Sequence, residues 1–191
     1  RGIDTVVHLA ANASPNTTWD SAVRDNITGT YHTFVAAKAA ACRRVIYASS
    51  IHAVSGYPVD VQVKTSEPVN PGDLYGVTKC FGEALTRYYF DRFGIEAVCL
   101  RIGSSFAEPA NPRMLVTYLS YDDLVLLVER ALFTPRVDHS IIYGVSDNAV
   151  KWWDNGKASH LGFHARDSSA RFASMFPPVA PSASDDPTLR F

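Results

Sequence analysis

The chain has 191 residues, of which 47% are hydrophobic and 19% are charged, and its formal net charge is −1. These values are typical of a globular protein with one well-filled core, and the chain is too short for two domains of ordinary size. Lys and Arg are not clustered and no apolar run approaches ~20 residues, which argues against a nucleic-acid-binding surface and against a membrane span.

The first part of the chain predicts a strand, a helix and a second strand. Residues 5–11, "TVVHLAA", form a short apolar run rich in β-branched side chains, which is typical of a buried strand. Over residues 20–42 the apolar side chains recur every three or four positions, which predicts one amphipathic helix. The run "RRVIYASS" over residues 43–50 predicts the next strand.

A long loop separates this part from the rest. Residues 51–73 hold several prolines and glycines, and irregular loops of this length are usually functional. A helix is then expected from Leu74 to a left-handed cap at Gly94. Beyond it, "EAVCLRIG" predicts a strand, "DDLVLLVERALFT" a helix that begins at Asp122, and "SIIYGVS" a further strand.

Strands that alternate with helices in this way predict parallel βαβ units and a doubly wound, mostly parallel α/β sheet. We expect one domain over residues 1–175, with a small substrate cap from about residue 104, and a flexible Pro/Ser-rich tail over residues 176–191. Ligands of such sheets bind at the carboxyl ends of the strands. The candidate positions are therefore residues 10–14, 49–52 and 103–105.

A tyrosine and a lysine stand four residues apart at the start of the predicted second helix. Tyr75 and Lys79 would therefore lie on one helix face, close to Ser50 at the end of the preceding strand. An adjacent ammonium would lower the pKa of the phenol, so Tyr75 is predicted to be a general base, with Ser50 donating a hydrogen bond to the reacting oxygen. The spacing alone is weak, because an exposed Tyr–Lys pair would look the same.

The motifs "HLAA", "YASS", "LYGVTK" and "LRIG", in this order, resemble the extended short-chain dehydrogenase/reductase family, the NAD-dependent epimerases and dehydratases with a Rossmann-like fold. The segments "SSIHAVSGYP", "LYGVTKCFGE" and "RIGSSFAEPANPRML" are most similar to the uronate dehydrogenases of that family. Those enzymes oxidise the anomeric carbon of galacturonate or glucuronate to an aldarolactone with NAD. The resemblance therefore implies an NAD-dependent sugar dehydrogenase.

The resemblance also implies a role for each matching residue. Tyr75 would remove the proton of the anomeric hydroxyl, Lys79 would bind the nicotinamide ribose, and Ser50 would orient the substrate hydroxyl. Arg113 would pair with the sugar carboxylate through two hydrogen bonds. The further implied contacts are Leu9, Ala10, Ala11 and Asn26 to the cofactor, and Ser14, His52 and Ser104 to the substrate.

Two departures from the family pattern stand out. Ile51 occupies a position where uronate dehydrogenases usually have Asn, which removes a possible hydrogen bond to the sugar. The glycine-rich turn that holds the dinucleotide pyrophosphate does not occur in these residues. We expect that unit to lie upstream, since a parallel sheet without its first strands would expose an apolar edge.

Two other functions remain open: a nucleotide-sugar epimerase or dehydratase of the same family, and a non-catalytic dinucleotide-binding sensor. The short stretch after Gly103 favours a free monosaccharide over a nucleotide-sugar. Three cysteines without CxxC spacing predict reduced thiols in a cytoplasmic protein. The expected partners are a small sugar acid and further copies of the chain, without nucleic acid or membrane.

Several other conspicuous side chains are predicted to be structural. They are His8 in the core, Asp122 and Asp123 as helix caps, Arg101 in its strand, Trp152 and Trp153 in the cap, and His160 and His164, which lack the company of other metal ligands.

Overall fold

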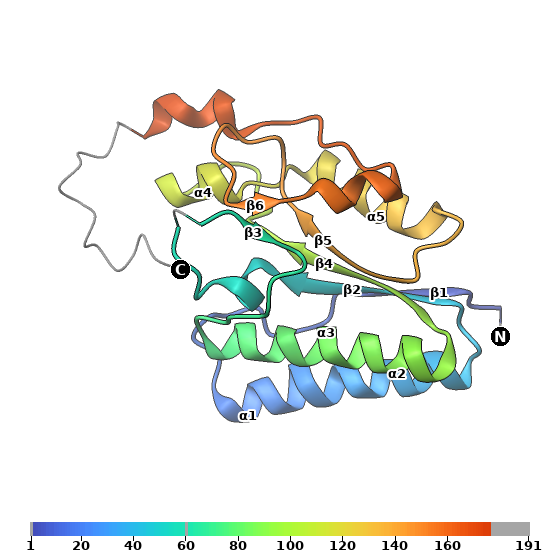
Figure 1. Ribbon diagram of the computed structural model, residues 1–191. Helices are drawn as coiled ribbons and strands as arrows, with labels where there is room; N and C mark the ends of the chain where they lie inside the picture. Colours follow the sequence, from blue (N-terminus) through green and yellow to red (C-terminus); the bar gives the residue numbers. More distant parts are fainter. Residues whose placement is uncertain (1, 60, 177–191) are drawn as a thin grey trace.

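The computed structural model describes residues 2–59 and 61–176 (Figure 1). In chain order the elements are β1 (Thr5–His8), α1 (Trp19–Ser21), the π-helix η1 (Ala22–Thr28), α2 (Gly29–Ala39), β2 (Arg44–Ser50), the 3₁₀ helix η2 (Ile51–Val54), β3 (Val63–Lys64), α3 (Leu74–Phe93), β4 (Glu96–Ile102), α4 (Pro112–Thr117), α5 (Tyr121–Phe133), β5 (His139–Gly144), β6 (Trp153–Asp154) and the 3₁₀ helices η3 (Gly156–Leu161) and η4 (Ser169–Met175).

The main sheet has four parallel strands in the order β1-β2-β4-β5. Helices α2 and α3 cover one face of the sheet, and α5 with η3 covers the other (Figure 1). This arrangement confirms the predicted doubly wound, parallel α/β fold. All four strands run in the same direction, so their carboxyl ends meet at one edge of the sheet, where the loops after β2 and β4 begin.

Each face of the sheet has its own apolar core, because successive side chains of a strand point to opposite faces. Val45 of β2 packs with Phe34 and Tyr89 on the side of α2 and α3. Its neighbour Ile46 packs with Leu127 of α5 and other apolar side chains on the opposite side. Burial on both faces explains why the strands read as almost continuous apolar runs.

The helix predicted over residues 20–42 is present but shorter and less regular. Helical structure runs from Trp19 to Ala39, and the segment η1 between α1 and α2 is a π-helix. The first strand is also shorter than predicted, since β1 ends at His8 and residues 9–14 form a loop. π-Helical segments are often found at functional sites, and this one carries Asn26.

Helix α3 begins and ends where the sequence predicts. The Asp73 carboxylate accepts a hydrogen bond from the Gly76 amide at 2.6 Å, and Gly94 has a φ of 68° at the C-terminal cap. The prediction for α5 was wrong in one detail, because the cap is Ser120 rather than the two aspartates. Asp123 is buried and accepts hydrogen bonds from Ser146 and from the backbone of residues 166 and 167.

The part that follows β4 is small. It contains α4, α5, β5 and the 3₁₀ helices η3 and η4, and its strand β6 pairs with β3 from the long loop. Trp153 is buried in this pair and stacks on Tyr143, in agreement with a packing role. The predicted tail, apart from Phe176, lies outside the residues that the structure describes. Among the described helices, none combines the length and the apolar character needed to cross a membrane.

Candidate active site

Three predicted catalytic side chains meet where β2 ends and α3 begins. Ser50 is the last residue of β2, and Tyr75 lies in the first turn of α3, near enough for the Ser50 hydroxyl to act on the pKa of the phenol. Lys79 lies one turn further along, with its Nζ 5.3 Å from the centre of the Tyr75 ring. All three residues are less than 9% exposed. The structure therefore brings the predicted serine, tyrosine and lysine together in one desolvated place.

The pKa of Tyr75 is shifted in the opposite direction from the prediction. Burial raises the pKa of the phenol, and the carboxylate of Asp73 raises it further, while the hydrogen bond with Ser50 lowers it. The expectation that Lys79 holds this pKa below its ordinary value is therefore wrong for the chain by itself. The loss of hydration on burial destabilises the phenolate by more than the neighbouring hydroxyl stabilises it, so the pKa rises.

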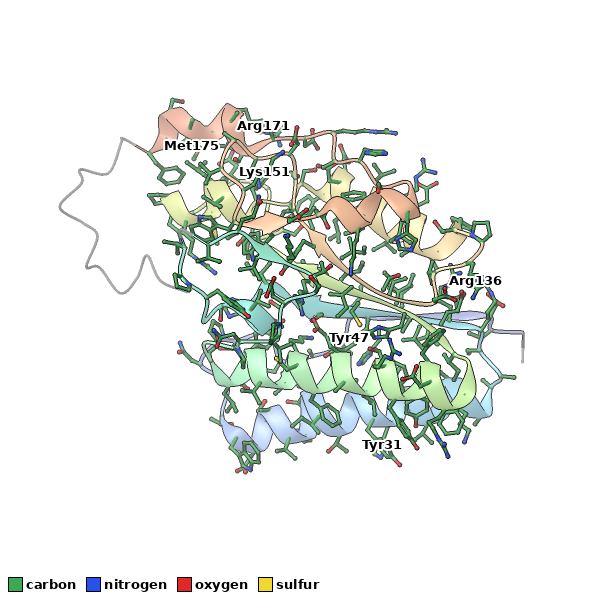
Figure 2. All side chains as sticks on the ribbon, in the orientation of Figure 1. Tyr31, Tyr47, Arg136, Lys151, Arg171 and Met175 are labelled. Atoms are coloured by element: carbon green, nitrogen blue, oxygen red, sulfur yellow. The ribbon has the colours of Figure 1, made fainter. Side chains whose placement is uncertain are left out.

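Lys79 is held between β2 and the tyrosine rings. Its ammonium donates a hydrogen bond to the Ala48 carbonyl at 2.8 Å and lies 5.2 Å from the centre of the Tyr47 ring, which Figure 2 places between the sheet and α3. Gly82 of α3 allows the Tyr47 ring to lie this close to the helix, because a Cβ at position 82 would collide with that ring. Burial lowers the pKa of Lys79 to about 8.

The nearby loop after β1 carries the predicted cofactor contacts. Leu9 and Ala10 are exposed and Ala11 is half-buried, so small and accessible groups follow the end of β1. Asn26, in contrast, is 2% exposed, and its side chain bonds both the amide and the carbonyl of Asn12. It also donates to Thr78 of α3, at 3.0 Å.

Both hydrogens of the Asn26 side-chain NH2 are therefore used within the protein, and Asn26 shapes the loop beside the site. A hydrogen bond from this NH2 to a cofactor would need one of these bonds to break, although the amide oxygen, which accepts from the Asn12 amide, has a second lone pair. The sequence did not single out Thr78, although it stands inside "YGVTK" and is completely buried. Its position directly before Lys79 was the available signal.

On the substrate side, His52 and Arg113 converge on an aspartate that the sequence reasoning missed. His52 Nδ1 lies 2.5 Å from Asp73 Oδ2, and the His52 ring packs edge-on against Tyr75 with 5.5 Å between ring centres. Arg113, from α4, is near enough for its charge to lower the pKa of Asp73. Asp73 is the last residue before α3, where a capping signal was visible.

The two other serines predicted to contact the substrate, Ser104 and Ser14, lie in different surroundings. Ser104 follows β4, and its hydroxyl shares a 2.7 Å hydrogen bond with Thr117 at the end of α4. Ser14 is exposed in the loop after β1, where its hydroxyl accepts a hydrogen bond from the Asn16 amide. Among the described residues, Ser14 makes its hydrogen bonds with Asn12, Asn16 and Thr17 and none with Ser50, Tyr75 or Lys79. A sugar contact for either serine stays a prediction.

We expect Gly76→Ala to impair the site. The new Cβ would meet the carbonyl oxygen of His52, which is backbone and cannot rotate away, so α3 and η2 must separate. Overpacking of this kind costs about 1–3 kcal/mol of unfolding free energy, and it would move Tyr75 away from Ser50. Urea unfolding and a dehydrogenase assay measure the two effects.

Gly29→Ala is the matched control, because its Cβ has ordinary contacts in the middle of a helical run. It should gain up to about 1 kcal/mol of stability and leave turnover unchanged. Equal activity in the two variants would show that the contact between Gly76 and His52 does not maintain the site.

A parallel sheet with a serine at the end of one strand, and a tyrosine and a lysine on the first turns of the following helix, defines a dehydrogenase-like site of the short-chain type. Residues 1–120 match the model of the NAD dependent epimerase/dehydratase family, and the chain belongs to this family. The family predicted from the sequence motifs is therefore confirmed.

Within this family, the chain is similar to uronate dehydrogenases over almost its whole length. The chain is 45% identical to the uronate dehydrogenase of Pseudomonas putida over 98% of this chain and 70% of that protein. It is 38% identical to the uronate dehydrogenase of Agrobacterium fabrum, over 100% and 72% of the two chains. A mutant uronate dehydrogenase from Agrobacterium tumefaciens, crystallised with NAD, has a TM-score of 0.92 and 38% identity, with coverage of 100% and 72%.

Proposed function

We propose that the chain is an NAD-dependent dehydrogenase that oxidises the anomeric carbon of a free uronate to an aldarolactone. The observation that carries the proposal is the meeting of Ser50, Tyr75 and Lys79 in a chain that is similar to uronate dehydrogenases over almost its whole length. The epimerase alternative is not better supported, because relatives that cover the chain at 38–45% identity are uronate dehydrogenases.

The residues at the site fit the dinucleotide. Among the described residues, the Lys79 ammonium donates one hydrogen bond, to the Ala48 carbonyl, so its two other N–H groups suit the hydroxyls of a ribose. The accessible backbone of residues 9–11 follows β1 on the same edge of the sheet, where such folds bind nucleotides. Bound NAD⁺ supplies a hydride acceptor and a positive charge.

In the proposed reaction Ser50 donates a hydrogen bond to the anomeric oxygen, and the phenolate form of Tyr75 receives the hydroxyl proton and becomes the neutral phenol. The bond between C1 and its hydrogen breaks as hydride leaves, and the C1–O bond becomes a carbonyl. Because burial raises the pKa of Tyr75, the phenol needs added positive charge to become a base at neutral pH. The ammonium of Lys79 would stabilise the phenolate once it forms.

The direct test is spectrophotometric NAD reduction with galacturonate and glucuronate. Activity with either acid supports the proposal, and the same assay with glucose 6-phosphate asks whether phosphate can replace carboxylate. Measurable NAD affinity with no activity on any sugar would favour the sensor instead. A UDP-sugar that changes configuration without net NADH would favour the epimerase.

A homo-oligomer in the cytoplasm is a further proposal. Size-exclusion chromatography would test the oligomeric state, and cell fractionation would test the location.

We expect Arg113→Ala to raise the KM for uronates by about tenfold or more, with a smaller change in kcat. A charge-assisted hydrogen bond to a carboxylate contributes about 1.5–3 kcal/mol, and Arg113 is held beside Asp73 at the edge of the site. Steady-state kinetics with a uronate and with the corresponding neutral aldose measure the effect. An equal loss with the neutral sugar would contradict the carboxylate contact.

A further inference from the structure

We propose that Asp73 is a positioning residue that holds His52 in one tautomer, so that His52 presents a hydrogen-bond acceptor to a sugar hydroxyl. The inference rests on the proposed function and assigns a role to a residue that none of the motifs singled out. The proposal is based on the different partners of the two carboxylate oxygens of Asp73: one contacts the Gly76 amide and the other contacts His52.

The first oxygen of Asp73 caps α3. Oδ1 accepts a hydrogen bond from the Gly76 amide at 2.6 Å and so fixes the first turn of the helix, which carries Tyr75. This is an ordinary capping role, and a serine, threonine or asparagine could also perform it. Taken alone, it would make Asp73 a structural residue.

The second oxygen does not serve the helix. Oδ2 lies 2.5 Å from His52 Nδ1, across the gap between η2 and α3. Both side chains are largely buried, with 18% and 22% of their surface exposed. Burial alone would raise the pKa of Asp73, but hydrogen bonds from His52 and Gly76, and the positive charges of Arg113 and of His52 when it is protonated, lower it, so the carboxylate is ionised.

An ionised carboxylate accepts hydrogen bonds and cannot donate them, so His52 must carry a proton on Nδ1. In the neutral ring this leaves Nε2 with a lone pair. Among the described residues Nε2 makes no hydrogen bond, and the ring packs against Tyr75, whose oxygen would meet the anomeric hydroxyl in the proposed reaction. A sugar hydroxyl placed there would find an acceptor.

Substitutions at Asp73 separate this role from capping. Asp73→Asn keeps an oxygen for the Gly76 amide but offers an N–H to His52, so the histidine must move its proton to Nε2 and become a donor toward the sugar. Asp73→Ser also keeps the cap but is too short to reach His52, so the tautomer is free. Asp73→Ala loses the cap as well.

The experiment measures steady-state kinetics with the best uronate, urea unfolding, and ¹⁵N NMR of the histidine rings in the chain without cofactor. We expect kcat/KM to fall by about tenfold in Asp73→Asn, mainly through KM, and by less in Asp73→Ser, although both should remain close to the wild type in stability. The NMR spectra should show His52 protonated on Nδ1 in the wild type and on Nε2 in Asp73→Asn.

A double-mutant cycle tests whether Asp73 acts through His52. In a His52→Gln background, Asp73→Asn should cost less than twofold in kcat/KM, because the residue that it positions is gone. Additive losses would overturn the proposal, and so would activity that follows stability across the three Asp73 variants. A doubly protonated or Nε2-protonated His52 in the wild type would also overturn it.

The NMR result does not depend on turnover, so the two proposals can fail separately. A wild type without activity on uronates, but with the Nδ1 tautomer that Asp73→Asn reverses, would contradict the function alone. An active wild type with an unchanged tautomer in Asp73→Asn would contradict the role of Asp73 alone.

Discussion

Tyr75→Phe is expected to lower kcat by about 10²-fold or more while leaving the fold and the affinity for NAD unchanged. The substitution removes one oxygen, and that oxygen is the group that must receive the substrate proton. Tyr75 is 8% exposed, and its ring packs against His52 and lies near Lys79, so phenylalanine keeps these contacts. The loss would therefore reflect chemistry rather than packing.

Initial rates at saturating uronate and NAD measure the effect, and circular dichroism with a fluorescence titration of NADH checks the fold and the cofactor site. Tyr88→Phe is the matched control, because Tyr88 lies on the same helix and is 51% exposed. It should retain the wild-type kcat. Turnover in Tyr75→Phe within a few-fold of the wild type would discard the mechanism.

The parts of this site that sequence reasoning found share a local signal. The end of α3 follows from a left-handed glycine, which acts within one turn of the helix. The spacing of Tyr75 and Lys79 fixes their common face once the helix is known. Strand alternation then places Ser50 at the same edge of the sheet, because parallel strands end together.

The parts that were missed depend on contacts between distant residues. The π-helix around Asn26 is joined to Asn12 and Thr78, which lie 14 positions before it and 52 positions after it in the sequence. The partnership of Asp73 with His52 depends on the path of the long loop, which no periodicity describes. The direction of the Tyr75 pKa shift was wrong for a related reason, since burial is a property of the folded chain and not of the Tyr–Lys pair.

A second large effect is expected in the buried network beneath the site. Arg101 of β4 donates two hydrogen bonds, each 2.9 Å long, to the carboxylate of Glu83 on α3. Ser49 donates to the same carboxylate at 2.6 Å, and Arg101 also donates to Tyr143 of β5. The side chains of the ion pair are 1% and 5% exposed. The network joins α3 to three strands of the sheet, directly behind Ser50.

Arg101→Met should therefore lower the free energy of unfolding by about 3–5 kcal/mol, because it leaves the Glu83 charge buried without its cation. Adding Glu83→Gln should recover much of this loss, since the amide oxygen can still accept from Ser49 and the unpaired charge is gone. Urea unfolding of the single and double variants measures both values. Arg87→Met removes an exposed pair on the same helix and should cost less than about 1 kcal/mol. If the double variant were no more stable than Arg101→Met, the loss would come from missing packing at Arg101 rather than from an uncompensated charge.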